Sequence, residues 1–265
     1  MRRAGWPGCG AVVEPLLSVR QLVKRFGALA ATDGASFDVM PGELHALIGP
    51  NGAGKTTLIH QISGALRPDA GAIVFDGRDL TNRPVAARVQ AGLVRSFQIT
   101  SLFKPCTVRD NLVLAVLARR EGLPSWWRPA RGDAAAHAEA EGLLARVGLA
   151  ALADRIAGTL AHGEQRQLEV GLALAARPRL LLLDEPLAGM GPDESARMVE
   201  LLQALKAEGL TLLLVEHDMD AVFRLADRVS TLVAGRVIAS DSPAVIREHP
   251  EVRRAYLGDE LEAMS

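Results

Sequence analysis

A glycine-rich loop between an apolar run and a helix-forming segment constrains the fold of this chain more than any other feature. Residues 49–57 match the pattern GxxxxGK[ST] and directly follow an apolar strand expected over Glu43–Ile48. Glycines let backbone N–H groups surround phosphates, and the helix that follows adds its positive N-terminal end. The pattern therefore predicts an ATP-binding loop, with Lys55 at the β- and γ-phosphates and the Thr56 hydroxyl on Mg²⁺. The nucleotide-binding residues expected here are Gly49, Pro50, Asn51, Gly52, Ala53, Gly54, Lys55, Thr56 and Thr57.

Two adjacent carboxylates end a second apolar strand, Leu180–Leu183. A strand that ends in paired acids suits a metal-bound triphosphate, because one acid can hold the metal while the other serves a water molecule. We expect Asp184 to bind Mg²⁺, directly or through water, and Glu185 to orient and deprotonate the attacking water. Without the phosphate loop, the same residues would be typical of a buried strand that ends at solvent.

The order of strands and helices predicts an α/β fold with a mostly parallel sheet. Strands are expected at Leu16–Val19, Ser36–Val39, Ala72–Phe75 and Leu210–Val215, and Pro192 opens a helix that Gly209 ends. The middle of the chain has a different pattern: helices are expected at Val108–Arg120, Ala134–Val147 and Ala151–Ala157. We therefore predict a helical subdomain, inserted into the α/β core over approximately residues 101–165.

Composition excludes several classes of protein. The formal net charge of −1 gives no basic excess of the kind that nucleic-acid binding requires, so no nucleic-acid partner is expected. Apolar runs stay far below the ~20 residues needed to cross a bilayer. The two cysteines, Cys9 and Cys106, are far apart in sequence and fit free thiols in a reducing cytoplasm. Residues 1–15 are expected to be a disordered N-terminal tail.

The turn Leu160-Ala161-His162-Gly163-Glu164-Gln165 precedes the acidic strand and resembles the signature motif of the ATP-binding cassette (ABC) family. The chain resembles an ABC ATPase from about Leu16 to Leu257, which implies one ABC ATPase domain over residues 16–258 and a C-terminal tail over 259–265. The implied fold is a P-loop NTPase core with a mostly parallel sheet, an antiparallel N-terminal β subdomain and an inserted α-helical subdomain.

The same resemblance assigns roles to residues elsewhere in the chain. Phe26 matches the aromatic residue that stacks on adenine, and His217 matches the switch histidine that contacts the γ-phosphate. Gln98 matches the glutamine that reaches the Mg²⁺ and couples the site to a membrane partner. In this family the signature turn acts across a dimer, so His162, Gly163 and Glu164 are expected to close onto ATP held by a second ABC ATPase subunit.

Two residues depart from the usual pattern of the family. Ala161 lacks the hydroxyl that the usual serine offers to the γ-phosphate, and one lost hydrogen bond of this kind costs roughly 1.5–3 kcal/mol. Gly191 stands where many relatives carry an aspartate. We therefore expect a weakened ATP site wherever this signature turn closes, within an asymmetric heterodimer or a homodimer.

Several stretches resemble the ATP-binding subunits of branched-chain amino acid importers. They include residues 95–98, His162–Arg166, Leu187–Met190, Glu216–Asp220 and Arg254–Gly258, and the region around Trp126-Trp127 fits the longer helical subdomain of that subgroup. The resemblance implies transmembrane permease subunits and, indirectly, a periplasmic solute-binding protein as partners. It places the chain on the cytoplasmic face of the inner membrane.

Three other functions remain open from the sequence alone. A lipopolysaccharide-export ATPase shares a Tyr-Leu-Gly-type ending, and membrane partners would distinguish it. A soluble ABC protein that acts on DNA or in translation generally carries tandem cassettes or long coiled coils, and this chain has one cassette. A P-loop kinase for a small molecule would not need residues 160–165.

Overall fold

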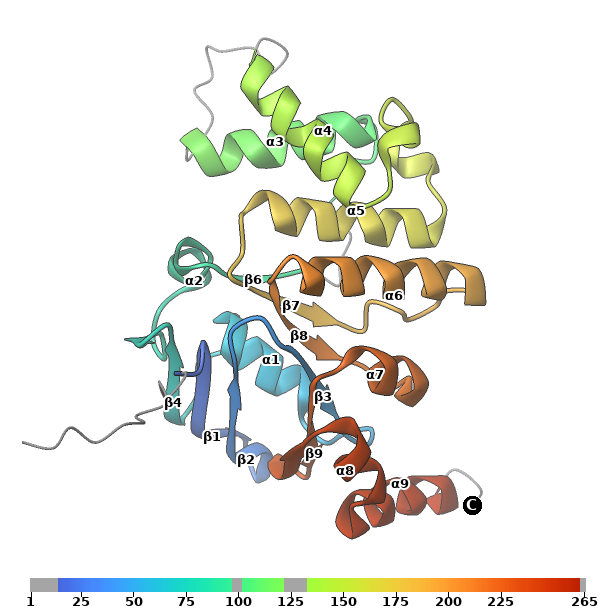
Figure 1. Ribbon diagram of the computed structural model, residues 1–265. Coiled ribbons are helices and arrows are strands. Elements are labelled where there is room, and N and C mark those ends of the chain that lie inside the picture. The colour runs from blue at the N-terminus through green and yellow to red at the C-terminus, as the bar shows by residue number, and fades with distance from the viewer. Residues whose placement is uncertain (1–13, 97–101, 122–132, 263–265) are drawn as a thin grey trace, which may run out of the picture.

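The computed structural model describes residues 14–96, 102–121 and 133–262. Two β-sheets and the helices around them form the lower part of the molecule in Figure 1, and α3, α4 and α5 form a separate helical layer above. The tail expected over residues 1–15 lies almost wholly outside the described residues. Over the described part of the chain, no helix combines the length and the apolar character that crossing a bilayer requires.

The larger sheet has six strands in the order β10-β9-β3-β8-β7-β6. Its central strands, β3 (Leu44–Ile48), β8 (Thr211–Val215) and β7 (Leu180–Asp184), pair in parallel, and every residue in them is buried. Uninterrupted apolar strands are typical of a parallel sheet whose two faces are both covered. The sheet is completed by β6 (Leu93–Arg95), β9 (Arg228–Val233) and β10 (Arg236–Asp241), of which only β10 runs antiparallel to its neighbour.

The smaller sheet is antiparallel and has the order β2-β1-β4-β5. Its strands are β1 (Leu17–Phe26), β2 (Leu29–Val39), β4 (Ala70–Phe75) and β5 (Arg78–Asp79). The strands expected at Leu16–Val19 and Ser36–Val39 are therefore only the buried ends of a longer hairpin. The distal part was missed because it alternates poorly and because Arg20, Gln21 and Arg25 of β1 are exposed and polar. Together the two sheets confirm the predicted α/β class with its antiparallel β subdomain.

Helices of the core cover both faces of the large sheet. The phosphate loop leads into α1 (Lys55–Ser63), and α2 (Val85–Ala91) precedes β6. The helix opened by Pro192 is α6 (Pro192–Ala207), as predicted. The remaining helices are α7 (Met219–Leu225), α8 (Pro243–Glu248) and α9 (Pro250–Glu262), so the predicted C-terminal tail from residue 259 is helical as far as Glu262.

The helical subdomain contains α3 (Val108–Glu121), α4 (Ala134–Arg146) and α5 (His162–Ala175). The helix expected at Ala151–Ala157 is wrong: this segment is two 3₁₀ turns, Ala150–Leu152 and Ala157–Thr159. Between them the chain makes an antiparallel bridge from Ile156 to Thr107, which replaces helical hydrogen bonds. Trp126 and Trp127 lie outside the described residues.

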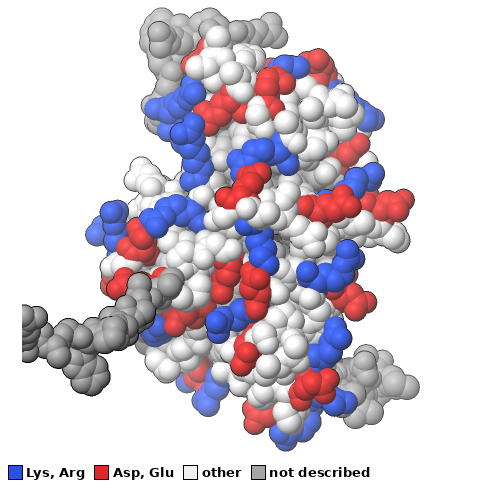
Figure 2. Space-filling view, in the orientation of Figure 1, with Lys and Arg blue, Asp and Glu red and all other residues white. Residues whose placement is uncertain are grey.

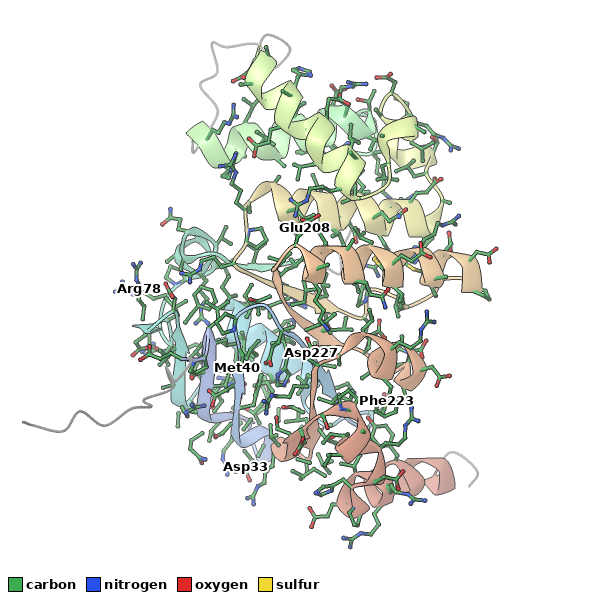
Figure 3. All side chains as sticks on the ribbon, in the orientation of Figure 1. Asp33, Met40, Arg78, Glu208, Phe223 and Asp227 are labelled. Carbon is green, nitrogen blue, oxygen red and sulfur yellow. The ribbon has the colours of Figure 1, made fainter. Side chains whose placement is uncertain are left out.

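The helical layer and the core share one hydrophobic cluster. Leu112 of α3, Leu144 of α4 and Leu168 of α5 belong to the same buried group as Leu181 and Leu212 of the sheet. The two layers are also joined at their edge, where Arg146 of α4 donates a 2.5 Å hydrogen bond to Glu208 at the end of α6 (Figure 3). The helical layer is therefore packed onto the core.

Charges of both signs are mixed over the surface. On the face shown in Figure 2, Lys and Arg side chains lie among Asp and Glu side chains over the core and the helical layer. Within the helical layer, the Glu139 carboxylate accepts hydrogen bonds from Arg119, Arg120 and Arg177. These three guanidinium groups outweigh burial and hold the pKa of Glu139 below its ordinary value. Opposite charges thus stabilise the helical layer locally.

Candidate ATP-binding and hydrolysis site

The predicted site residues converge because of the strand order. The phosphate loop follows β3, the acidic pair ends β7, and His217 follows β8, which lies between those two strands. Parallel strands end at the same edge of a sheet, and α/β sheets bind ligands at that edge. Segments more than 130 positions apart in the chain are thereby brought to the same edge of the sheet, where β3, β8 and β7 lie side by side (Figure 1).

The phosphate loop has a backbone shape that only glycine permits at two positions. Gly49 and Gly54 have φ angles of 154° and 100°, and a Cβ atom on them would lie 2.1 Å from the Leu232 carbonyl oxygen and 2.0 Å from the Ala31 carbonyl oxygen, respectively. The loop is thus held tightly against β9 and β2. These close contacts restrict the loop backbone, and a restricted backbone suits phosphate binding at a helix start.

Lys55 already lies within this loop. Its ammonium group donates hydrogen bonds to the carbonyl oxygens of Gly49, at 2.5 Å, and Pro50, at 3.0 Å. The cation is therefore held at the place where the phosphates of a nucleotide bind in loops of this type. Thr56, the second residue of α1, is exposed beside it.

Asp184 is buried, with only 3% of its side chain exposed, and it forms an ion pair with Arg95. The Arg95 Nη2 donates a 2.8 Å hydrogen bond to the Asp184 Oδ2. The donors expected to hold a metal, Asp184 and the Thr56 hydroxyl, are hard oxygens of the kind that Mg²⁺ prefers. In this structure the positive charge beside Asp184 is the Arg95 guanidinium. Within the described residues, no group of three or more His, Cys, Asp or Glu side chains could hold a metal.

Glu185 has an unusual backbone conformation for a non-glycine residue, with a φ of 49°. Its N–H donates to the Val215 carbonyl at the end of β8, and its own carbonyl accepts from Ala188. These bonds turn the chain sharply after β7, at a cost of the order of 1 kcal/mol for the left-handed conformation. The Glu185 carboxylate is partly exposed, and its Oε1 lies 3.9 Å from Nδ1 of His217. The turn therefore places the expected base beside the expected switch histidine.

Glu216 is a buried carboxylate that the sequence analysis did not single out. Only 1% of the residue is exposed, and burial raises its pKa. Its carboxylate accepts hydrogen bonds from the Leu187 N–H, at 2.9 Å, and the His217 N–H, at 3.2 Å. Glu216 thereby fixes the loop after β7 relative to the histidine after β8. Its place directly before His217 was the only available signal.

The signature turn opens α5 with its first residues at the surface. Ala161 is the N-cap residue (φ −63°, ψ 161°) and is exposed, as is His162. The alanine methyl offers no acceptor to the first turn, so the Glu164 carboxylate makes half of a capping box alone, by accepting from the Ala161 N–H at 2.8 Å. The N-terminal end of α5, with its positive partial charge, thus lies at the surface of the molecule.

Two further predicted residues have different outcomes. Phe26, at the end of β1, exposes 52% of its surface, and Lys24 lies 5.8 Å from the centre of its ring. An exposed aromatic ring at this position is free to stack on a base. Gln98 lies outside the described residues, so its role stays a prediction.

A mainly apolar groove of about 460 Å³ lies between the core and the helical layer. Its walls come from α2, α3 and α5, and Arg95 and Ser96 line it where β6 ends. The exposed hydrophobic side chains of Val85 and Phe103 lie at this groove. Arg95 therefore lines the groove and also contacts Asp184.

Comparison with known protein families gives two matches. Residues 32–188 match the model described as ABC transporter, and residues 236–262 match the model described as branched-chain amino acid ATP-binding cassette transporter. The first match includes the phosphate loop, the signature turn and the acidic pair.

Individual proteins are similar over nearly the whole chain. The high-affinity branched-chain amino acid transport ATP-binding protein LivG of Escherichia coli (strain K12) is 39% identical over 255 residues, covering 93% of this chain and 99% of LivG. The corresponding protein BraF of Pseudomonas aeruginosa is 38% identical over 257 residues, with the same coverage. Among solved structures, the ADP conformation of MJ1267, an ATP-binding cassette of an ABC transporter, matches with a TM-score of 0.83 and 32% identity, covering 92% of this chain and 99% of MJ1267.

Proposed function

The chain belongs to the family of ABC transporter ATP-binding proteins, and from this we propose that it is the ATP-hydrolysing subunit of an importer for branched-chain amino acids or related small polar solutes. Its enzymatic activity is that of an ATPase, as in the family as a whole.

The proposed chemistry follows from the converging loops. Lys55 and the loop amides bind the β- and γ-phosphates, and Phe26 stacks on the adenine. Glu185 orients a water molecule for in-line attack and takes its proton, while His217 contacts the γ-phosphate from the neighbouring strand end. Thr56, Asp184 and Gln98 would hold Mg²⁺, which neutralises phosphate charge.

The signature turn of α5 is proposed to act on ATP held by a second cassette. Its N-terminal end, exposed at Ala161 and His162, can approach the phosphates of a partner subunit, while Gly163 is buried and donates its N–H to the Glu194 carboxylate. Ala161 and Gly191 remove two groups that usually serve this contact. We therefore expect the two ATP sites of the dimer to be unequal, which favours a heterodimer with a similar ATPase that carries the complete motif.

The apolar groove is the proposed docking place of a permease. It presents Val85 and Phe103 at the surface, and Arg95 in its wall contacts the expected metal ligand. A short amphipathic helix from the cytoplasmic side of a transmembrane subunit fits an apolar groove of this size. Binding there would place the chain on the cytoplasmic face of the inner membrane and connect ATP turnover with the permease.

The substrate class rests on the relatives and on the C-terminal match. LivG and BraF are named for high-affinity branched-chain amino acid transport, and residues 236–262 match the corresponding C-terminal family. In the proposed importer, a periplasmic binding protein selects the solute, and this chain supplies energy.

One observation carries the proposal: the loops after β3, β7 and β8 bring Lys55, Glu185 and His217 to one edge of the sheet. The test is to purify the tagged protein from its native membrane, identify the companions by mass spectrometry, and measure leucine uptake in cells with and without the gene. We expect permease subunits and a second ATPase among the companions, with uptake lost on deletion and restored by the wild-type gene. Recovery of lipopolysaccharide-export components, or unchanged uptake of leucine and other small polar solutes, would contradict the proposal.

A further inference from the structure

Arg95 and Asp184 form a buried ion pair at the ends of two adjacent parallel strands. Arg95 is the last residue of β6 and lies opposite Leu182 in the register with β7, so its side chain extends forward to reach Asp184. The side chains expose 12% and 3% of their surface, respectively. The Asp184 charge is thus neutralised from within the chain, by a group that none of the predicted site roles uses.

A third titratable group faces this pair from the helix of the phosphate loop. Burial lowers the pKa of His60 in α1, Arg95 lowers it further, and Asp184 opposes the shift. Removal of the guanidinium from Asp184 would leave an uncompensated carboxylate beside the phosphate loop, which is the charge that a divalent cation needs.

We propose that Arg95 is a built-in counter-ion that holds Asp184 before the metal arrives and must leave the carboxylate when Mg²⁺ binds with the nucleotide. Two cations at one buried carboxylate repel each other strongly because the surroundings screen poorly. Arg95 is therefore a positioning residue, which keeps Asp184 ordered in the metal-free state and lowers the affinity of the site for the metal. This inference rests on the proposed metal role of Asp184.

The place of Arg95 connects this exchange with the groove. Arg95 lines the groove between the core and the helical layer, and its Nε atom is buried without a hydrogen-bond partner among the described residues. A guanidinium that moves away from Asp184 can move into the groove, which Arg95 already lines. Metal binding would then alter the charge presented to a docked permease helix, and a docked helix would in turn alter metal affinity, as reciprocal coupling requires.

The test measures metal affinity rather than turnover. Mn²⁺ is titrated into the ADP-bound full-length protein, and free Mn²⁺ is followed by electron paramagnetic resonance for the wild type, Arg95→Gln, Arg95→Lys and Arg119→Gln. Arg119 is the matched control because it is also a partly buried arginine, but it pairs with Glu139 at 2.8 Å within the helical layer. ADP binding in EDTA checks that each variant is folded.

We expect Arg95→Gln to bind Mn²⁺ on the order of tenfold more tightly than the wild type. Arg95→Lys keeps the charge but loses the planar fork, so a smaller increase is expected, and Arg119→Gln should match the wild type. If Arg95→Gln binds Mn²⁺ as tightly as the wild type or more weakly, this inference is overturned, and the proposed metal site still stands. Failure of the wild type to bind Mn²⁺ with ADP would instead overturn the proposed metal site and the inference with it.

A second measurement needs no variant and covers the case in which Arg95→Gln does not fold. The side-chain ¹⁵N signal of the Arg95 Nε–H is followed in the wild type with ADP in EDTA and then with excess Mg²⁺. A shift on addition of Mg²⁺, absent for Arg119, supports displacement of the guanidinium. An unchanged Arg95 signal would contradict it.

Discussion

The Glu194 carboxylate in the first turn of α6 accepts a 3.1 Å hydrogen bond from the backbone N–H of Gly163 in the first turn of α5. It also accepts from the Gly191 N–H at 3.3 Å. A Cβ atom on Gly163 would lie 2.9 Å from the carboxylate carbon of Glu194, so glycine permits this close approach. One side chain thus joins the signature turn to the loop in which Gly191 replaces the usual aspartate.

This contact predicts a pH-dependent contribution to stability. The N–H groups of Gly163 and then of Gly191 lower the pKa of Glu194 from its ordinary value of 4.5. A carboxyl whose folded pKa is lowered stabilises the fold above the unfolded pKa, and this contribution is lost as the pH falls through the folded pKa. Glu194→Gln should therefore be less stable than the wild type at pH 7, and the difference should shrink below about pH 4.5.

Urea unfolding between pH 3 and pH 7 measures this difference. Asp193→Asn is the control, because Asp193 lies in the same helical turn and is exposed. A gap between Glu194→Gln and the wild type that does not change with pH would contradict the assigned cause.

Ala161→Ser is expected to act in two ways. A serine hydroxyl at the N-cap accepts a hydrogen bond from the first turn of α5, which Ala161 cannot do, and this should raise the free energy of unfolding by about 1 kcal/mol. In the assembled transporter, the same hydroxyl restores a contact to the γ-phosphate, and ATP turnover should rise by roughly tenfold.

The matched control is Ala145→Ser, the same substitution at an exposed position near the end of α4. Urea unfolding and phosphate release in the purified complex provide the two readings. Unchanged ATPase and transport rates in Ala161→Ser would refute the idea of a weakened site.

Arg88 is expected to be a main support of the phosphate-loop helix. It is 1% exposed, and its guanidinium donates to the carbonyl oxygens of Gln61, Ile62, Arg83 and Thr81, while burial lowers its pKa to about 10. Two of these carbonyls belong to the last turn of α1, so the charge stabilises the C-terminal end of the helix dipole.

Arg88→Met should lower the free energy of unfolding by about 3 kcal/mol, because several buried carbonyls lose their donor. Arg88→Lys keeps the charge but cannot reach all four oxygens, and an intermediate loss is expected. Guanidinium chloride unfolding measures both variants. A loss below 1 kcal/mol for Arg88→Met would show that water replaces the guanidinium.

The sequence predicted the convergence of the site because it depends on strand order and motif alone. Asp184 ends β7, and Lys55 and His217 lie in the segments after β3 and β8; these are mostly apolar strands of five residues each, and parallel strands end at one edge. The predicted boundaries of α6 also agree with the structure, since Pro192 and Gly209 are strong local signals.

Other features depend on contacts that a sequence pattern does not carry. The Arg95–Asp184 pair spans 89 positions, and either residue could have found another partner. The left-handed backbone of Glu185 is imposed by hydrogen bonds from β8 and the following loop, since local preference favours another conformation. From the sequence, Glu216 is expected at the surface beside His217, but its carboxylate is buried and accepts a hydrogen bond from the Leu187 N–H.

The role of Glu185 as the base that activates water is the central claim, and Glu185→Gln tests it most directly. The amide keeps the size of the side chain but cannot take a proton, so turnover should fall by at least about 100-fold. The variant with its partner cassette should still bind ATP and remain a closed dimer in size-exclusion chromatography. Glu200→Gln, an exposed position on α6, should hydrolyse ATP at the wild-type rate. Wild-type hydrolysis by Glu185→Gln would contradict the account.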